Sequence, residues 1–243
     1  MRSPPHVPWN QKASVLFWRG GAHFVDSPEH SRAKLACHSR SSDIYVKGDV
    51  DLLDVGFHDP PERLVDKNFL QHCTRPFVPF NQSGNYKYLA ILDGNGYTER
   101  FKIYTSLNSL LIWWPGGRGD EYEHFHAGFK NGTNILIVKS LQALLWAVRY
   151  ARKHDAETKK MAERMNRFSD WMFHADTTDC YLHLLLTEYA KTFRGDALSA
   201  RNETLYSTTQ FDHLEEIMVP KPSKFLKATF KRRCAEVRRA RPT

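Results

Sequence analysis

The sequence has few of the features that would place it in a membrane or around a metal ion. Its 243 residues contain no run of about 18 consecutive apolar residues, so no segment is expected to cross a bilayer. The four cysteines lie far apart without a Cys-x-x-Cys pair, which argues against zinc and leaves the disulfide state open. The segment from Met1 to Trp9 is polar and proline-rich and lacks the apolar core of a signal peptide.

The amino-acid composition limits the size of the core and the kinds of partner that the chain can bind. With 41% hydrophobic and 13% aromatic residues, the chain can bury one sizeable core. A net charge of +8 suits an anionic ligand, an acidic polysaccharide, nucleic acid or a membrane surface, and it does not choose among them. Three Asn-x-Ser/Thr sequons, at Asn81, Asn131 and Asn202, are typical of a secretory lumen, although chance also produces them in a chain of this length.

Residues 86–101 predict a strand, a turn and a helix in succession. Tyr86 to Leu92 is an apolar run too short for a helix, which indicates a buried strand. Asp93-Gly94 and the Asn-Gly pair after it form turns, and a helix is expected from Arg100. Backbone N–H groups at such a turn attract anions, and an arginine in the first helical turn can reach a phosphate. The alternative is an ordinary turn with a solvated arginine.

A second informative stretch lies near the start of the chain. Val15 to Trp18 reads as a buried strand, and Arg19-Gly20-Gly21 reads as a turn that brings the backbone close to a ligand or a helix. A helix is expected from about Ser31, with Arg32 in its first turn. The alternatives are a surface ion pair for Arg19 and a solvated helix face for Arg32.

Later segments predict further strands and helices. Ser109 makes a turn or a cap before the strand Leu110–Trp114, and another strand is expected over Ile135–Val138. The acidic and aromatic segment from Asp120 to His126 resembles a helix start, where acidic residues are expected from the helix dipole alone. Ser140 and Asp155 are expected to cap two amphipathic helices.

The alternation of strands and helices from Val15 to Val138 predicts an α/β domain with a mostly parallel sheet. In such sheets, the loops at the carboxyl ends of the strands bind ligands. The two glycine-containing turns fall on these loops. Beyond Arg194 the chain becomes basic and loses its periodicity, which indicates a solvated tail. This tail lacks the interleaved aromatic residues of a single-strand binder, so no nucleic-acid partner is expected.

Two segments resemble motifs of the CAP10-like glycosyltransferases, glycosyltransferase family 90, which includes the protein O-glucosyltransferases. Residues 86–101, YKYLAILDGNGYTERF, are similar to a "KYL…DGNG…RF" motif, and residues 8–20 are similar to "PW…K…FWRG". The resemblance implies the second, nucleotide-sugar-binding half of a GT-B glycosyltransferase: a Rossmann-like, mostly parallel sheet with flanking helices and a helical C-terminal extension. The implied divisions are a leader at 1–14, the CAP10-like domain at 15–193 and a basic tail at 194–243.

The resemblance also implies which residues contact the nucleotide sugar. The arginine of the DGNG motif, a diphosphate ligand in the family, is Arg100 here. Ser109 falls on a serine near the nucleotide, and Glu123 falls on an acidic segment near the donor sugar. The implied donor contacts are Arg19, Gly20, Arg32, Asp93, Gly94, Arg100, Ser109 and Glu123.

The function implied is transfer of a sugar such as glucose or xylose from a UDP-sugar to a hydroxyl group of a protein or glycan. The implied mechanism is inverting and needs neither a metal nor a cofactor beyond the UDP-sugar, and the implied location is the lumen of the endoplasmic reticulum or Golgi. In the family, the aspartate that acts as general base lies in a preceding domain, so no residue here inherits that role.

One departure from the family pattern supports a different hypothesis. The family carries an L-x-P-W-x-H-Y-x-P segment where this chain has residues 129–138, without the tryptophan or the histidine-tyrosine pair. The alternative is a truncated, catalytically inactive remnant or a nucleotide-sugar-binding protein.

Overall fold

A computed structural model defines the conformation of most of the chain. The residues that it describes are 7–22, 25, 29–38, 50–58, 73–92, 98–115, 123–190, 234–237 and 239. Asp93 and Gly94, the sequon at Asn202 and nearly all of the predicted tail at 194–243 lie outside these residues.

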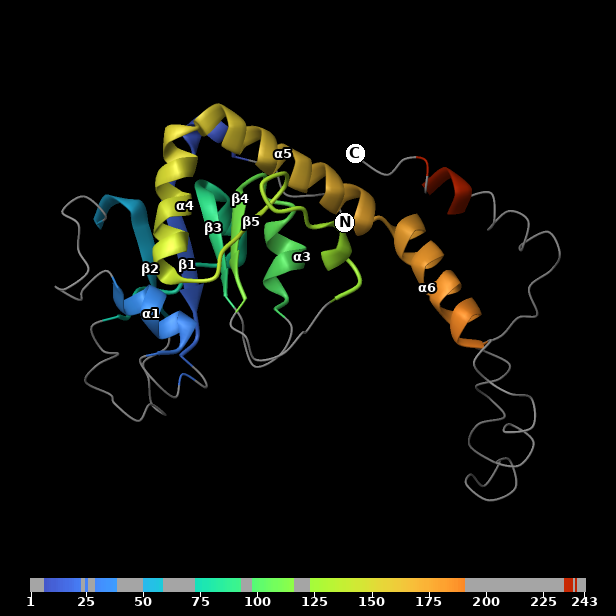
Figure 1. Ribbon diagram of the computed structural model, residues 1–243, viewed down its shortest axis with the longest axis horizontal. Coiled ribbons are helices and arrows are strands. Elements are labelled where there is room, and N and C mark those ends of the chain that lie inside the picture. The colour runs from blue at the N-terminus through green and yellow to red at the C-terminus, as the bar shows by residue number, and fades with distance from the viewer. Residues whose placement is uncertain are drawn as a thin grey trace, which may run out of the picture. The chain divides into compact units, whose positions relative to one another are not determined.

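The centre of the fold is a five-stranded parallel sheet with strand order β2-β1-β3-β4-β5 (Figure 1). The strands are β1 (Ala13–Gly20), β2 (Leu53–Phe57), β3 (Tyr86–Leu92), β4 (Leu110–Trp114) and β5 (Leu136–Ile137). The predicted α/β class with a parallel sheet is therefore confirmed. The predicted bounds of β3 and β4 are also confirmed, whereas β5 is two residues shorter than the strand expected over Ile135–Val138.

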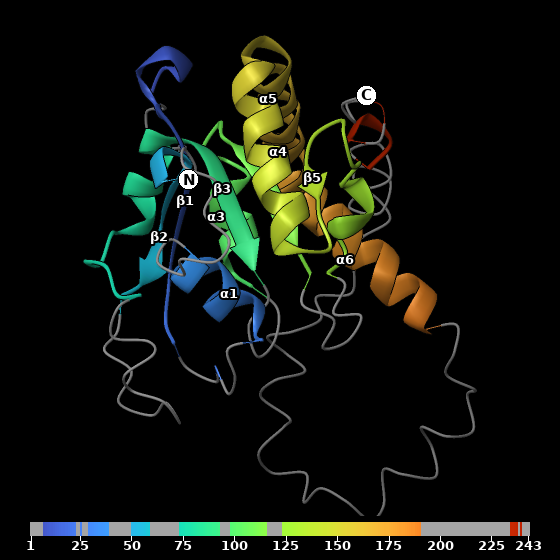
Figure 2. The same ribbon diagram turned by 60° about the vertical axis from the view of Figure 1, so that its left-hand side comes forward.

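Helices cover both faces of the sheet. The α-helices among the described residues are α1 (Ser31–His38), α3 (Arg100–Tyr104), α4 (Leu141–Lys153), α5 (Asp155–Met172) and α6 (Ala175–Ala190). Helices α1 and α4 lie on one face and α3 lies on the other (Figure 2). All five residues of β4 are buried as a result, which explains why this strand is continuously apolar rather than alternating.

The core on the α1/α4 face is built from alternate residues of the strands. Trp18, Ala90 and Ile112 belong to one apolar cluster with residues of α1 and α4. On the other face, the Phe101 ring of α3 packs edge-on against Trp113 of β4, with the ring centroids 5.2 Å apart. The layers follow from the two-residue period of a strand, which sends neighbouring side chains to opposite faces.

The amino ends of the strands are joined to the start of α5 by an ion pair. Asp155 accepts hydrogen bonds from Lys87 Nζ at 2.8 Å and from Trp9 Nε1 at 3.0 Å. The prediction that Asp155 caps this helix is wrong, because its carboxylate binds these two side chains instead. The cap predicted at Ser140 is confirmed, since its hydroxyl accepts from the backbone N–H of Ala143.

Lys12 is a buried cation at the same amino edge. Its ammonium donates to the Leu107 carbonyl at 2.7 Å and to the Ser109 hydroxyl at 2.9 Å, without a carboxylate among these contacts. Burial lowers the pKa of Lys12 from 10.5 to about 8. The protonated ammonium therefore costs folding free energy that the neutral amine does not.

This cost predicts that the free energy of unfolding rises with pH. Between pH 8 and 10 the unfolded chain keeps the Lys12 proton that the folded chain releases, so stability is expected to increase by roughly 2 kcal/mol. Above pH 10 the trend reverses, because burial raises the pKa values of Tyr86 and Tyr88 to about 12 and only the unfolded tyrosines ionise. Urea unfolding at several pH values measures the rise. A Lys12→Met variant with the same slope as the wild type would contradict the assignment.

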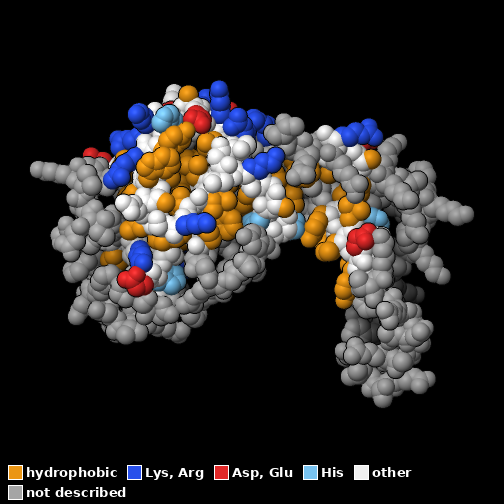
Figure 3. All heavy atoms as spheres, viewed as in Figure 1, with side chains coloured by type: hydrophobic (Ala, Val, Ile, Leu, Met, Phe, Trp, Pro, Cys, Tyr) orange, Lys and Arg blue, Asp and Glu red, His pale blue; other side chains and the backbone are white. Residues whose placement is uncertain are grey.

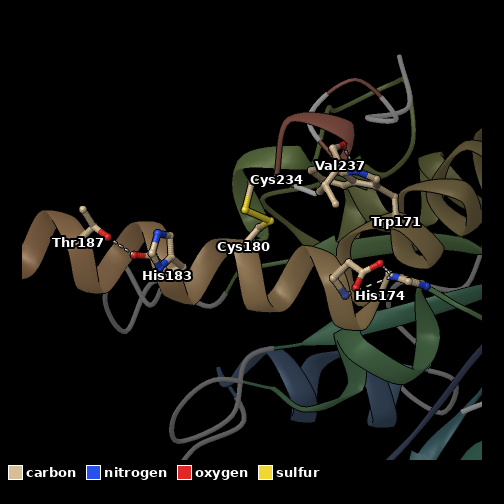
Figure 4. Close-up of a disulfide and its surroundings, with 8 residues drawn as sticks. Trp171, His174, Cys180, His183, Thr187, Cys234 and Val237 are labelled. Carbon is tan, nitrogen blue, oxygen red and sulfur yellow. Dashed lines mark hydrogen bonds and ion pairs between the residues drawn. A yellow bond between two sulfur atoms is a disulfide. The ribbon is translucent and has the colours of Figure 1, made fainter. Parts of the chain in front are cut away.

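Chain contacts divide the molecule into two units, Met1–Asp170 and Trp171–Thr243. The boundary predicted at residue 193 lies outside the described residues and stays a prediction. In the second unit, the disulfide Cys180–Cys234 ties α6 to the C-terminal helical residues (Figure 4). The indole of Trp171 donates to the Val237 carbonyl at 2.9 Å and adds a second link there. Among the described residues, no helix is both long and apolar enough to cross a membrane.

Candidate functional site

The first element of the site is the carboxyl end of β1. Gly20 is the last residue of this strand, and a Cβ atom there would overlap the Trp18 ring and lie 3.1 Å from Nη2 of Arg100. The missing side chain therefore allows the guanidinium of Arg100 to approach the strand end. Gly20 and Arg100, 80 positions apart in the sequence, meet at the sheet edge where parallel sheets bind ligands.

Arg100 opens α3, and its guanidinium lies between aromatic rings. The guanidinium carbon lies 5.5 Å from the centre of the Trp18 ring and 5.8 Å from that of Phe80. Its Nη1 atom is buried and has no hydrogen-bond partner among the residues that the structure describes. Burial lowers the pKa of Arg100. A desolvated guanidinium with unused donors is strongly stabilised by an anion that accepts them.

Arg32 approaches the same edge from α1. It lies in the first turn of this helix, and its Nη1 donates to the Gly21 carbonyl at 3.3 Å. Gly21 directly follows β1. The structure therefore brings Gly20, Arg32 and Arg100 together around the carboxyl end of one strand.

Arg19 is held in an ion pair with Asp54. Its guanidinium pairs with the Asp54 carboxylate and donates to the backbone carbonyls of Asp54 and Pro76. Its side chain is 7% exposed. The ion pair considered as the alternative for Arg19 is therefore present, with the Arg19 side chain buried and the Asp54 side chain 31% exposed. A ligand contact by Arg19 stays a prediction.

Ser109 lies at the opposite end of the sheet from Arg100. It precedes β4, is 1% exposed, accepts from Lys12 Nζ and donates to the Tyr86 carbonyl at 2.7 Å. These bonds join the starts of three strands, a structural role that goes beyond the local turn or cap considered for it. The expected contact with the nucleotide stays a prediction, as do the contacts assigned to Asp93 and Gly94 outside the described residues.

Glu123 follows β4 and is half-buried, with the Oε1 atom of its carboxylate inaccessible to solvent. Its Oε1 atom has no hydrogen-bond partner among the described residues, while its backbone N–H donates to Nδ1 of His126 at 3.2 Å. Burial raises the pKa of Glu123, and the positive charge of Lys102 on α3 opposes part of this rise. A carboxylate with a free acceptor suits a ligand hydroxyl group.

Sequence reasoning missed the aromatic residue that flanks Arg100. Phe80 belongs to a proline-rich segment that reads only as a loop, and its contact with Arg100 spans 20 positions. No local sequence pattern predicts a contact between residues that are this far apart in the chain. Among the described residues, no group of three or more histidines, cysteines or acidic residues is arranged to hold a metal ion. The expectation that no metal is needed remains a prediction.

One group of exposed basic side chains is separate from this site. Lys and Arg side chains gather over the junction of α4 and α5 (Figure 3), where α4 ends with Arg152 and Lys153. Helix α4 runs back across the sheet, so this junction lies at the amino edge with Asp155 and Lys87. The arginines at the carboxyl edge are therefore a separate feature from this exposed charge.

Comparisons with known proteins agree with the motifs. The sequence profile described as "Glycosyl transferase family 90" matches residues 2–212. Protein O-glucosyltransferase 2 of Danio rerio is 27% identical over 186 residues, which cover 75% of this chain and 34% of that protein. Protein O-glucosyltransferase 1 of Bos taurus is 27% identical over 198 residues, covering 79% of this chain and 45% of the relative. The chain thus spans less than half the length of these relatives.

Proposed function

Since the chain belongs to glycosyl transferase family 90, we propose that it forms the donor-binding half of a glycosyltransferase. The donor is a UDP-sugar, with glucose or xylose as the sugar, and the acceptor is a hydroxyl group of a protein or glycan. The relatives named protein O-glucosyltransferases support this choice of reaction.

The observation that carries the proposal is the buried Nη1 atom of Arg100. This atom has no hydrogen-bond partner within the described part of the chain, and it lies at the sheet edge that also holds Gly20 and Arg32. The diphosphate of a UDP-sugar supplies negatively charged oxygens that accept from a guanidinium in a forked geometry. A diphosphate at this position would accept from Nη1, which the described residues leave without an acceptor.

In the proposed reaction, the acceptor oxygen forms a bond to the anomeric carbon while the bond from that carbon to the β-phosphate oxygen breaks. The electron pair of the broken bond stays with UDP, so negative charge grows on the diphosphate. Arg100 and Arg32 would stabilise that charge in the transition state, without a metal ion. We assign inversion at the anomeric carbon, and we assign no residue of this chain as the base that takes the acceptor proton.

Glu123 is proposed to accept a hydrogen bond from a hydroxyl of the donor sugar. Replacing it with leucine, which has a similar size but no hydrogen-bond acceptor, removes one hydrogen bond to the donor sugar. We expect this change to weaken UDP-glucose binding about fivefold, roughly 1 kcal/mol. The affinity for UDP itself is expected to equal that of the wild type, since UDP lacks the donor sugar that Glu123 is proposed to contact. Titration calorimetry with both ligands measures the difference, and Glu163→Gln on α5 serves as the control for lost charge. An equal loss for both ligands would contradict the sugar contact.

The compartment proposed is the lumen of the endoplasmic reticulum or Golgi. The four cysteines form two disulfides, Cys37–Cys73 and Cys180–Cys234, which are typical of proteins that mature in oxidising compartments. This evidence and the relationship to protein O-glucosyltransferases indicate the secretory pathway.

The experiment that tests the donor site is calorimetric titration of UDP, UDP-glucose and UDP-xylose into the folded chain. We expect UDP to bind with micromolar to millimolar affinity. If the folded chain binds none of the three ligands, the donor-site proposal is wrong.

A further inference from the structure

We propose that Asn131 is a modification site that carries an N-linked oligosaccharide. Asn131-Gly132-Thr133 matches the acceptor sequon, which is a short motif that also arises by chance. The structure supplies independent support through the exposure, conformation and hydrogen bonding of this segment. The inference concerns modification of the protein itself and does not rest on the proposed sugar transfer.

All three residues of the sequon are exposed on a tight turn. Asn131 forms a bridge with Ile135, and the N–H of Gly132 donates to the Ile135 carbonyl at 2.8 Å. Gly132 has a φ of 73°, and no heavy atom lies within 4 Å of the position a Cβ would occupy there. The exposed sequon therefore stands beside open space at Gly132, next to the residue that would carry the oligosaccharide.

The side-chain amide of Asn131 is held by its oxygen and leaves its nitrogen available. Oδ1 accepts from the N–H of Ile137 at 2.9 Å, while Nδ2 has no hydrogen-bond partner in the part of the chain that the structure describes. The glycan is attached to the nitrogen. Attachment there preserves the hydrogen bond that anchors the side chain to β5.

The covalent step requires a lipid diphosphate oligosaccharide as donor and an oligosaccharide-transferring enzyme. A bond forms between Asn131 Nδ2 and the anomeric carbon of the oligosaccharide, and the bond from that carbon to the diphosphate oxygen breaks. The lipid diphosphate leaves with the electron pair, and the displaced Nδ2 proton passes to a base of the transferring enzyme. These reactants occur in the oxidising compartment that the two disulfides also indicate.

The position of the turn separates the glycan from the arginine site. Asn131 precedes β5 and therefore lies at the amino edge of the parallel sheet, whereas Arg100 follows β3 at the carboxyl edge. Loss of the glycan is therefore expected to leave UDP affinity unchanged. The sequon at Asn81 differs, because its Ser83 is 1% exposed and Asn81 adjoins Phe80, which contacts Arg100.

The test uses the chain produced in eukaryotic cells behind a cleavable secretory leader. The secreted protein is treated with peptide N-glycosidase in heavy-oxygen water, and the peptide containing Asn131 is analysed by mass spectrometry. We expect heavy oxygen in most copies of this peptide, at Asn131. An unmodified Asn131 in the secreted, disulfide-bonded chain would overturn the proposal.

Three variants separate modification from folding. Asn131→Asp keeps an oxygen that accepts from the N–H of Ile137 but removes the nitrogen to which the glycan is attached. On a gel, this variant is expected to migrate as a protein with one glycan fewer than the wild type. Thr133→Ala removes the sequon and should lose the same glycan, whereas Thr133→Ser keeps the sequon and should retain it. Glycan occupancy at Asn131 in Thr133→Ala equal to that of the wild type would also overturn the proposal.

Discussion

Replacing Arg100 with alanine is expected to lower the affinity for UDP by about ten- to one-hundred-fold, which corresponds to about 1.5–3 kcal/mol. The variant loses charge-assisted hydrogen bonds between a desolvated guanidinium and the diphosphate. Among the described residues Arg100 has no carboxylate partner, so its removal should not unfold the protein, since it also removes a desolvation cost. Titration calorimetry of UDP into both proteins measures the difference.

Two further variants make this test specific. Arg100→Lys keeps the charge but loses the planar fork, so its affinity should fall between those of the wild type and the alanine variant. Arg167→Ala removes one positive charge from an exposed position on α5 and should leave UDP affinity unchanged. Equal affinities of Arg100→Ala and the wild type would exclude Arg100 as the diphosphate ligand.

Loss of the Cys37–Cys73 disulfide is expected to reduce the free energy of unfolding by about 4 kcal/mol. This bond links residues 36 positions apart, so it removes much conformational freedom from the unfolded chain. In the folded state it joins the end of α1 to the segment beside β2, where the Phe57 N–H donates to the Cys73 carbonyl. Alanine is the suitable replacement at both positions because both cysteines are buried.

Urea unfolding of the Cys37→Ala/Cys73→Ala double variant measures this loss. Helix α1 also carries Arg32, so the double variant should bind UDP more weakly than the wild type does. The matched control is Cys180→Ala/Cys234→Ala, which removes the other disulfide in the second unit and should leave UDP affinity unchanged. An unfolding midpoint equal to that of the wild type would show that the Cys37–Cys73 bond contributes no stability.

The sheet was predictable because its strands have local signals. β3 and β4 are short apolar runs bounded by turn residues, and their predicted limits agree with the structure. Burial on both faces produces such runs, so the parallel architecture follows from the same pattern. The start of α3 at Arg100 was also predictable, since turn dipeptides precede it in the sequence.

The sequence alone thus determined the fold class, the limits of β3 and β4, and the placing of Arg32 and Arg100 in the first turns of α1 and α3. Only the tertiary structure decided which polar groups pair. Asp155 binds Lys87 and Trp9 rather than a helix end, and Lys12 and Ser109 close the amino edge. The pairing of the cysteines and the contact between Phe80 and Arg100 also depend on the tertiary structure. Strands and helices depend on neighbouring residues along the chain, whereas these contacts join residues 20 or more positions apart, and only the packing of the whole sheet brings them together.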